Sequence, residues 1–311
     1  MNADPFQEAL ILTGPTGSGK SELALELAER LGAEIVSMDS MALYRGMDIG
    51  TAKPSREERQ RVPHHLLDVL DPWQSASVAW WLEQAAACCR EIVARGRRAL
   101  IVGGTPLYLK AVVCGLFEGP PANEAIRQQL NAEAEQFGNE FLHARLARID
   151  PRTARRLHRN DVRRVVRALE VWELTGKPIS AWQQQWTKTV QSCSTDDQWP
   201  RVLCLDVPRP ELYQRIDQRV ERMIAAGWIE EVQALRQLPR PLSKEAAQAL
   251  GYKEWFAYLD GQATLAETKE RIQSRSRQFA KRQLTWFRHL PGCRFADRKL
   301  TFLLWGSKIE Q

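Results

Sequence analysis

A phosphate-binding pattern lies near the N-terminus of the chain. Residues 14–21 read G-P-T-G-S-G-K-S and directly follow the apolar run 9–13. The pattern G-x-x-x-x-G-K-[ST] holds phosphates when a strand precedes it and a helix follows, and we expect that helix over 21–31. Its glycines let backbone N–H groups converge on an anion, and the helix N-terminus adds partial positive charge. The pattern predicts a site for a chain of phosphates. It leaves open whether they belong to ATP, GTP or another molecule, and a structural glycine-rich turn is the alternative.

Two polar side chains of this loop have expected roles. Lys20 is the point charge for terminal phosphate oxygens, and Ser21 can offer its hydroxyl to Mg²⁺, which takes its other ligands from water and phosphate. The predicted phosphate-binding residues are Gly14, Pro15, Thr16, Gly17, Ser18, Gly19, Lys20 and Ser21.

Other candidate residues follow two further apolar runs. Asp39 comes after the run 34–38, and Gly103-Gly104-Thr105 follows the run 98–102. Proteins with a parallel sheet place their ligands at the carboxyl ends of the strands. There Asp39 could bind Mg²⁺ or act as a base, and the glycines would let another molecule approach the backbone. Each feature alone could be a turn, but three at successive strand ends favour a site.

The elements that carry these residues predict an α/β fold. The runs 9–13, 34–38 and 98–102 are short and apolar, as in buried parallel strands, and an alanine-rich helix is expected over 77–95. Strands that alternate with helices build a doubly wound sheet.

The pattern changes at Gly119-Pro120-Pro121, after which only helices are expected, over 123–137, 139–148 and 161–174. A polar loop is expected at 191–197, a strand at 202–207, and then helices over 210–238, 243–259 and 264–289. We therefore predict one α/β core from residues 1–118 and 199–311, interrupted by a helical insertion domain over 119–198.

Composition limits the class of protein. The 311 residues are 44% hydrophobic and 26% charged, which is ordinary for a globular protein. No apolar run approaches 18 residues and no secretion signal is visible, so we expect neither a membrane span nor export. The six cysteines show no C-x-x-C pair and no zinc spacing. This favours reduced thiols in the cytoplasm.

The charge is concentrated in two clusters. The net charge is +6; residues 152–167 hold seven arginines with one acid, and residues 271–288 hold six basic residues with none. Two such clusters indicate a surface that follows a polyanion, and two solvated helix faces are the alternative.

Five motifs together resemble the bacterial tRNA dimethylallyltransferases. They are G-P-T-G-S-G-K-S, D-S-M-A-L-Y-R-G-M-D-I-G-T-A-K-P, V-G-G-T-P-L-Y, A-L-G-Y-K-E and A-K-R-Q-L-T-W-F-R, in the family's order, over about residues 10–290. The resemblance implies a P-loop NTPase-like sheet with a helical insertion. The chain departs from many relatives at Met41-Ala42, where they carry Gln-Val, and at Ser21, where threonine is commoner.

The resemblance also implies a reaction. A dimethylallyl group passes from dimethylallyl diphosphate to N6 of adenosine 37, beside the tRNA anticodon, and diphosphate leaves. The phosphate loop then holds the pyrophosphate, with Mg²⁺ on Ser21. Asp39 matches the family residue that accepts the amine proton. Thr105 and Arg219 are the candidates that stabilise the leaving group.

A base within a folded tRNA loop must be extruded to reach such a site. The contacts expected with the anticodon stem-loop are Asp39, Ser40, Met41, Ala42, Thr105, Arg127, Arg163, Arg164, Val165, Val166, Arg167, Gln248, Ala249, Leu250, Gly251, Tyr252, Lys253, Lys281, Arg282, Gln283, Trp286 and Arg288.

Three other functions share part of this pattern. A small-molecule kinase has the same loop but no need for two basic clusters. A prenyltransferase of free adenine nucleotides has the same site without an extended RNA surface. A non-enzymatic P-loop RNA-binding protein does not require Asp39. We expect a monomer.

Overall fold

The computed structural model describes residues 4–116, 119–183 and 200–306. The chain divides into two compact units, Met1–Val113 with Thr195–Gln311, and Cys114–Ser194. The loop expected at 191–197 and the boundary expected at 198/199 lie outside the described residues.

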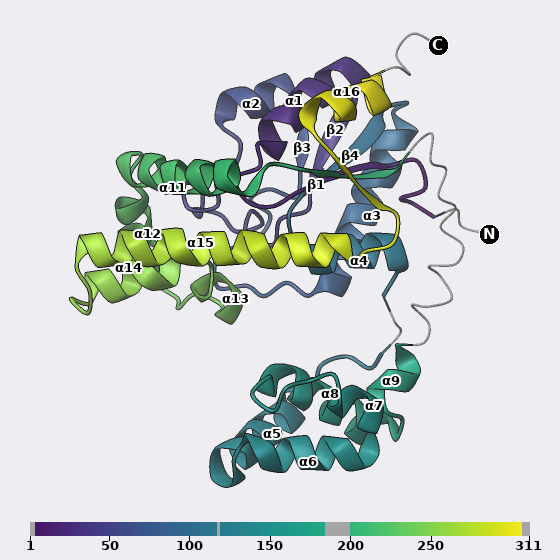
Figure 1. The fold of residues 1–311 in the computed structure, drawn as a ribbon, viewed down its shortest axis with the longest axis vertical. Helices are drawn as coiled ribbons and strands as arrows, with labels where there is room; N and C mark the ends of the chain where they lie inside the picture. The colour runs from purple at the N-terminus through teal and green to yellow at the C-terminus, as the bar shows by residue number, and fades with distance from the viewer. Residues whose placement is uncertain (1–3, 117–118, 184–199, 307–311) are drawn as a thin grey trace. The chain divides into compact units, whose positions relative to one another are not determined.

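The first unit is built on a parallel sheet with the strand order β3-β2-β4-β1-β5-β6. Figure 1 labels β1, β2, β3 and β4 of this sheet. The expected strands coincide within two residues with four of its members, and the prediction of a parallel α/β fold is confirmed. The other two strands were missed, because β3 is only two residues long and β6 is partly exposed. Neither therefore shows the apolar pattern that predicts a strand. The strands are β1 Leu10–Thr13, β2 Ala33–Ser37, β3 His64–His65, β4 Arg98–Gly103, β5 Val202–Leu205 and β6 Cys293–Ala296.

Helices cover both faces of this sheet. Alternate residues of the strands, such as Leu10 and Leu12, join one apolar cluster with α1 and α16. On the other face α3 packs against β2 and β4, where Trp81 stacks on Tyr108 at 4.2 Å between ring centroids and its indole N–H donates to the Ser37 carbonyl. These helices are α1 Lys20–Leu31, α2 Arg56–Arg61, α3 Val78–Ala94, α4 Pro106–Cys114 and α16 Arg298–Gly306.

A helical layer follows β5. The sequence predicted two uninterrupted helices, over 210–238 and 243–259. Each is broken by a glycine at positive φ, Gly227 at 96° and Gly251 at 91°, so those two predictions were wrong. Glycine adopts this left-handed conformation without steric cost, and it ends a helix. The long helix expected over 264–289 is confirmed. The helices are α11 Arg209–Ala225, α12 Trp228–Arg236, α13 Lys244–Ala247, α14 Tyr252–Leu259 and α15 Leu265–Arg288.

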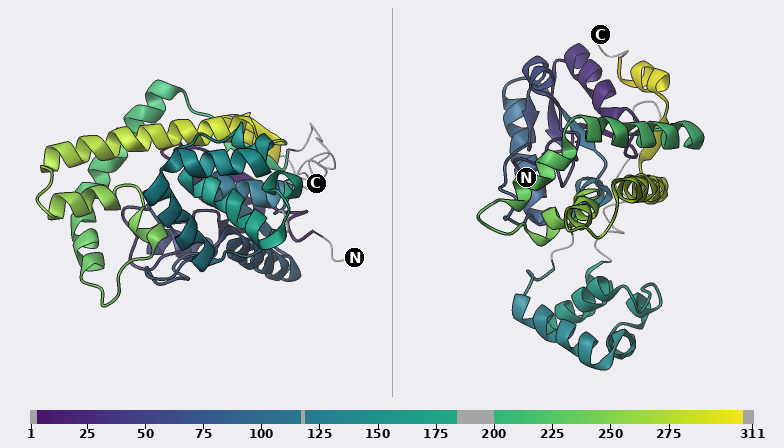
Figure 2. Two further views of the ribbon diagram at one scale, coloured as in Figure 1. Left: turned by 90° about the horizontal axis from the view of Figure 1, so that it is seen from below. Right: turned by 90° about the vertical axis from the view of Figure 1, so that its left-hand side faces the viewer.

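The helix α15 packs against two neighbours. Leu212 and Ile216 of α11 pack on Ala280 and Leu284 of α15, so the two helices lie side by side (Figure 1). Near the middle of α15 an ion pair joins Arg275 to Glu254 of α14. Figure 2 shows α15 as one long, unbroken yellow helix. One face of α15 is therefore buried along its length and the opposite face is exposed.

The second unit is a small helical bundle. The helices expected over 123–137, 139–148 and 161–174 are present, and two short ones were not expected. Its core is formed by apolar residues such as Leu130, Leu146 and Leu169. The helices are α5 Glu124–Phe137, α6 Asn139–Ile149, α7 Pro151–Ala154, α8 Val162–Thr175 and α9 Ile179–Trp182. In the described part of the chain, no helix combines the length and apolarity needed to cross a bilayer.

Candidate active site

The strand ends bring the predicted residues together. In the sheet Thr13 pairs with Gly103, and Ser37 pairs with Val102, so β1, β4 and β2 end at one edge. There the Ser40 N–H donates to Thr105 Oγ1 at 3.1 Å, and the Thr105 N–H donates to the Met38 carbonyl at 3.3 Å. The structure therefore places the segment of Asp39 beside Thr105, next to the phosphate loop that follows β1.

The phosphate loop leads directly into α1. This helix begins at Lys20, and no side chain among the described residues caps its N-terminus. Its first N–H groups and the partial positive charge of the helix are therefore available to an anion. The Ser18 hydroxyl is buried without a hydrogen-bond partner in the described structure. Buried polar groups are normally paired, so an unpaired oxygen in this loop is consistent with the predicted phosphate site.

Burial of Lys20 lowers the pKa of its ammonium group to about 8, and the charge of Arg219 adds to this effect. The carboxylate of Asp39 opposes both by favouring the charged form. The Lys20 ammonium donates to the Pro15 carbonyl at 3.3 Å. A partly desolvated cation in this position gains from a bound anion, which replaces the lost hydration.

Arg219 reaches the same site from α11. Burial lowers the pKa of its guanidinium, while Asp39 opposes that shift and Arg222 adds to it. Arg219 and Asp39 both act on the pKa of Lys20, and Asp39 also acts on the pKa of Arg219. Residues from β1–α1, from the end of β2 and from a helix about 200 positions later meet at one point. Two cations are suited to bind an anionic leaving group, and one carboxylate is suited to accept a proton.

Arg215 was missed by the sequence analysis. Its guanidinium donates to the Ser18 carbonyl at 3.3 Å and also pairs with Glu211. Arg215 lies four residues before Arg219 on α11, so both point from the same helix face. This i, i+4 spacing of arginines was a signal that could have found it.

The donor set fits a magnesium ion that shares its ligands with phosphate. The described residues contain no group of three or more His, Cys, Asp or Glu side chains able to hold a metal. Mg²⁺ is commonly held by one or two protein oxygens together with waters and phosphate oxygens. Ser21 is exposed in the first turn of α1, and Asp39 is near enough to Lys20 for its charge to act on the Lys20 pKa. The magnesium site stays a prediction.

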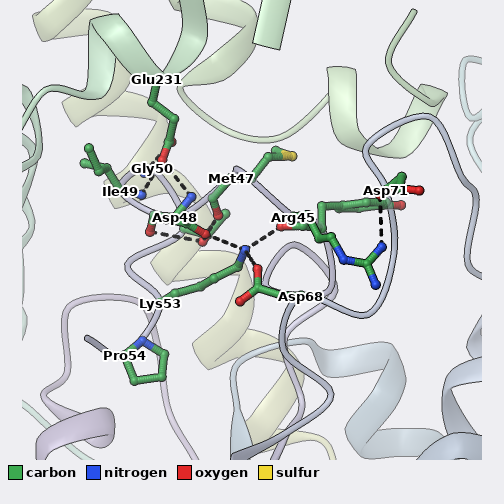
Figure 3. A network of polar contacts seen from close by, with 12 residues as sticks. Arg45, Met47, Asp48, Ile49, Gly50, Lys53, Pro54, Asp68, Asp71 and Glu231 are labelled. Carbon is green, nitrogen blue, oxygen red and sulfur yellow. Dashed lines mark hydrogen bonds and ion pairs between the residues drawn. The ribbon is translucent and has the colours of Figure 1, made fainter. Parts of the chain in front are cut away.

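The segment after Asp39 is held by a buried lysine (Figure 3). The Lys53 side chain is 1% exposed and donates to the Tyr44 carbonyl, to Asp48 at 2.7 Å and to Asp68 at 2.5 Å. Burial favours neutral Asp68, but hydrogen bonds from Lys53 and Arg59 outweigh it and lower the pKa of Asp68. The motif residues 41–54 thus fold around an internal cation.

Glu231 of α12 fixes the same segment from outside (Figure 3). Its carboxylate accepts from the N–H groups of Asp48 at 2.7 Å, Ile49 at 2.6 Å and Gly50 at 3.2 Å. The Tyr252 hydroxyl donates to it at 2.6 Å. A side chain on Gly50 would clash with Trp228, since a Cβ there would lie 2.1 Å from its indole nitrogen. The motif around Gly50 and the motif around Tyr252 therefore both help to fix the position of this loop.

The residues expected to contact RNA in the first unit differ in exposure. Six are exposed: Gln248, Lys253, Lys281, Arg282, Trp286 and Arg288. Five are half-buried: Asp39, Ser40, Met41, Thr105 and Leu250. Five are buried: Ala42, Ala249, Gly251, Tyr252 and Gln283. The buried side chains serve packing and hydrogen bonds within the protein, and the exposed ones are free to meet a polyanion.

In the second unit, too, the residues expected to contact RNA differ in exposure. Arg163 and Arg164 are exposed on α8, whereas Val165 and Val166 belong to its apolar core. Arg127 and Arg167 both pair with Glu170, whose side chain is 0% exposed. Their guanidinium groups balance a buried carboxylate, which is a structural task. Contact with RNA stays a prediction for this unit.

Comparisons with known proteins identify the family of the chain. The model of the IPP transferase family matches residues 42–290, and that of the isopentenyl transferase family matches residues 7–69. The tRNA dimethylallyltransferase of Geobacter metallireducens is 48% identical over 288 residues, which cover 93% of this chain and 92% of that protein. That of Xanthomonas campestris pv. campestris is 45% identical over 96% of this chain and 91% of its own length.

Solved structures agree with the sequence comparison. The tRNA isopentenylpyrophosphate transferase of Bacillus halodurans is 38% identical and superposes with a TM-score of 0.68, covering 98% of this chain and 97% of that chain. A eukaryotic dimethylallyltransferase, described as acting on tRNA, is 26% identical with a TM-score of 0.72, over 96% of this chain and 76% of its own.

Proposed function

The chain belongs to the IPP transferase family, and from this we propose that it is a tRNA dimethylallyltransferase. It moves a dimethylallyl group from dimethylallyl diphosphate to N6 of adenosine 37, next to the anticodon, and releases diphosphate. The observation that carries the proposal is the meeting of Lys20, Arg219 and Asp39 beside an uncapped helix N-terminus. This site can hold a diphosphate and, next to it, accept a proton.

The exchange of bonds defines what the residues must do. The N6 lone pair forms a bond to the first carbon of the dimethylallyl group while the bond from that carbon to the diphosphate oxygen breaks. The amine proton passes to the Asp39 carboxylate, and the electron pair of the broken bond stays on diphosphate. An exocyclic adenine amine is a weak nucleophile, so a positioned base assists its attack.

The cations of the site act on the departing group. Negative charge grows on the bridging oxygen as the bond breaks, and Lys20 and Arg219 stabilise it electrostatically. The Thr105 hydroxyl oxygen accepts a hydrogen bond from the Ser40 N–H. This supports the proposed role in which the hydroxyl proton is donated to the departing oxygen. Ser21 would hold Mg²⁺, and the ion would supply further neutralisation of this charge.

The RNA partner is proposed to be the anticodon stem-loop of tRNA. Support comes from the exposed Lys281, Arg282 and Arg288 of α15 and from Arg163 and Arg164 of α8. We further propose that the enzyme works in the cytoplasm and as a monomer.

A transfer assay tests this function. The protein is incubated with labelled dimethylallyl diphosphate, Mg²⁺ and either unmodified tRNA or AMP. We expect label in tRNA alone, at adenosine 37, located by nuclease digestion. Label in AMP but not in tRNA would replace this function with prenylation of free nucleotides. A tRNA whose adenosine 37 is replaced by guanosine is the matched control.

A further inference from the structure

One buried amide links the basic helix α15 to the phosphate loop. Gln283 is 3% exposed although it lies between exposed basic residues in the sequence. Its Oε1 accepts from the Thr16 N–H at 2.9 Å, and its Nε2 donates to the Gly104 carbonyl at 2.7 Å. Thr16 belongs to the phosphate loop, and Gly104 to the turn after β4.

The partners of Gln283 determine its orientation. An N–H group requires an acceptor and a carbonyl requires a donor, so each end of the amide has a single suitable partner. The approach is also close: a Cβ on Gly104 would lie 2.6 Å from the Gln283 nitrogen and 3.6 Å from Lys20 Nζ. The glycine of the V-G-G-T motif therefore makes room for the glutamine of the A-K-R-Q-L motif.

The same turn of α15 faces outward with its other side chains. Lys281 and Arg282 precede Gln283 and are exposed, and Trp286 is 41% exposed. Ala280, Leu284 and Phe287 are buried with Gln283 on the inner face. One helical turn therefore presents cations to a polyanion on one side and holds the phosphate loop on the other.

We propose that Gln283 is a positioning residue that couples RNA binding on α15 to diphosphate binding in the phosphate loop. The inference rests on the proposed function, since it takes RNA as the ligand of the outer face. A ligand that fixes α15 restrains Thr16 and Gly104 through the two hydrogen bonds of the amide. Coupling between binding sites is reciprocal, so bound diphosphate strengthens RNA binding by the same factor.

Titration calorimetry with three proteins tests the coupling. Inorganic pyrophosphate with Mg²⁺ is the probe, with and without a saturating unmodified anticodon stem-loop. For the wild type we expect RNA to tighten pyrophosphate binding about fivefold or more. Gln283→Met keeps the length of the side chain but loses both bonds. It should weaken pyrophosphate binding without RNA by about tenfold and abolish the enhancement by RNA.

Gln273→Met is the matched control. Gln273 lies on the same helix and donates to the Asp217 carbonyl of α11 at 3.3 Å, rather than to a group of the phosphate loop. This variant should bind pyrophosphate as the wild type does, with the same enhancement by RNA. Thermal unfolding of both variants checks that they are folded.

Three outcomes would overturn the inference: wild-type pyrophosphate binding indifferent to RNA, an unchanged enhancement in Gln283→Met, or its equal loss in Gln273→Met. The proposed function fails separately. A protein with RNA-enhanced pyrophosphate binding but no prenyl transfer contradicts the function and leaves the coupling intact. A protein that transfers the prenyl group but shows no coupling contradicts the coupling and leaves the proposed function intact.

Discussion

At the scale of single residues, the site combines groups whose charges oppose one another. Lys20 and Arg219 are desolvated cations that repel each other, and Asp39 partly relieves both. A bound diphosphate would satisfy the cations and leave the carboxylate to serve the incoming amine. Two residue-level predictions follow from this arrangement.

The first concerns the base. Asp39→Asn keeps the side-chain oxygen that accepts from the Met41 N–H, at 2.9 Å in the native protein, but cannot take up a proton. We expect the rate of prenyl transfer to fall by about 10²- to 10⁴-fold, as for loss of a general base. Pyrophosphate binding should persist, as measured by calorimetry. Asp71→Asn removes an exposed ion pair with Arg45 and should leave the rate unchanged. A near-native rate in Asp39→Asn would remove Asp39 from this role.

The second concerns pH. The Lys20 pKa of about 8 means that the free protein loses this charge above that pH. A bound anion favours the charged form and raises the pKa, so binding above pH 8 takes up a proton. Pyrophosphate affinity should therefore fall by up to about tenfold per pH unit above 8. In Lys20→Arg the cation stays charged, so only the titration of pyrophosphate itself remains. Identical pH profiles for the two proteins would contradict the prediction.

At the scale of elements, the motif segment 41–54 is a loop whose position is fixed by hydrogen bonds and ion pairs from other parts of the first unit. Lys53 binds this loop from within. Glu231, which lies on α12, accepts hydrogen bonds from three consecutive N–H groups of the loop. Consecutive N–H groups around one anion form a nest, a backbone arrangement that is usually filled by a ligand oxygen. In this protein a side chain fills it, and the loop position depends on α12 and α14.

Amide hydrogen exchange tests this clamp. In Glu231→Gln the acceptor loses its charge and one of its oxygens, so the N–H groups of 48–50 lose protection. We expect their exchange to accelerate about thirtyfold, equivalent to about 2 kcal/mol for hydrogen bonds to a charged group. Glu230→Gln changes an exposed carboxylate on the same helix and should leave these rates within about twofold. Equal rates in both variants would show that Lys53 holds the loop without Glu231.

At the scale of the whole molecule, the two basic clusters lie in different units. The cluster 271–288 belongs to α15 of the first unit, and the cluster 152–167 belongs mostly to α7 and α8 of the second. Several of these cations are paired within their own unit, such as Arg277 with Asp217 and Arg159 with Glu140. We therefore expect RNA affinity to depend on fewer cations than the two clusters contain.

Salt dependence measures how many cations act. The affinity for the anticodon stem-loop should fall steeply with salt, because phosphate contacts release counterions, while pyrophosphate affinity should fall much less. Arg163→Ala and Lys281→Ala should each reduce the slope of log affinity against log salt by about 1. Arg61 is exposed and pairs with Glu29, so Arg61→Ala is the control that leaves the slope unchanged. Unchanged slopes in all three variants would remove both clusters from the RNA surface.

The sequence by itself determined four strands of the sheet, the phosphate loop and the family resemblance. These depend on local patterns: short apolar runs, a glycine-lysine-serine spacing and motifs in a fixed order. Asp39 and Thr105 could be predicted as neighbours because strands that pair in parallel end at the same edge. The helix breaks at Gly227 and Gly251 could not, because a glycine is tolerated in a helix until tertiary packing selects positive φ.

Only the tertiary structure decided which polar residues face inward. Gln283 lies in a basic motif and was expected to touch RNA, yet its partners Thr16 and Gly104 are 267 and 179 positions away in the sequence. Arg127 and Arg167 were expected on the RNA surface, yet Glu170 holds them both. A residue type specifies which bonds a side chain can make. Which of them form depends on the groups that folding brings within reach, and these lie far away along the chain.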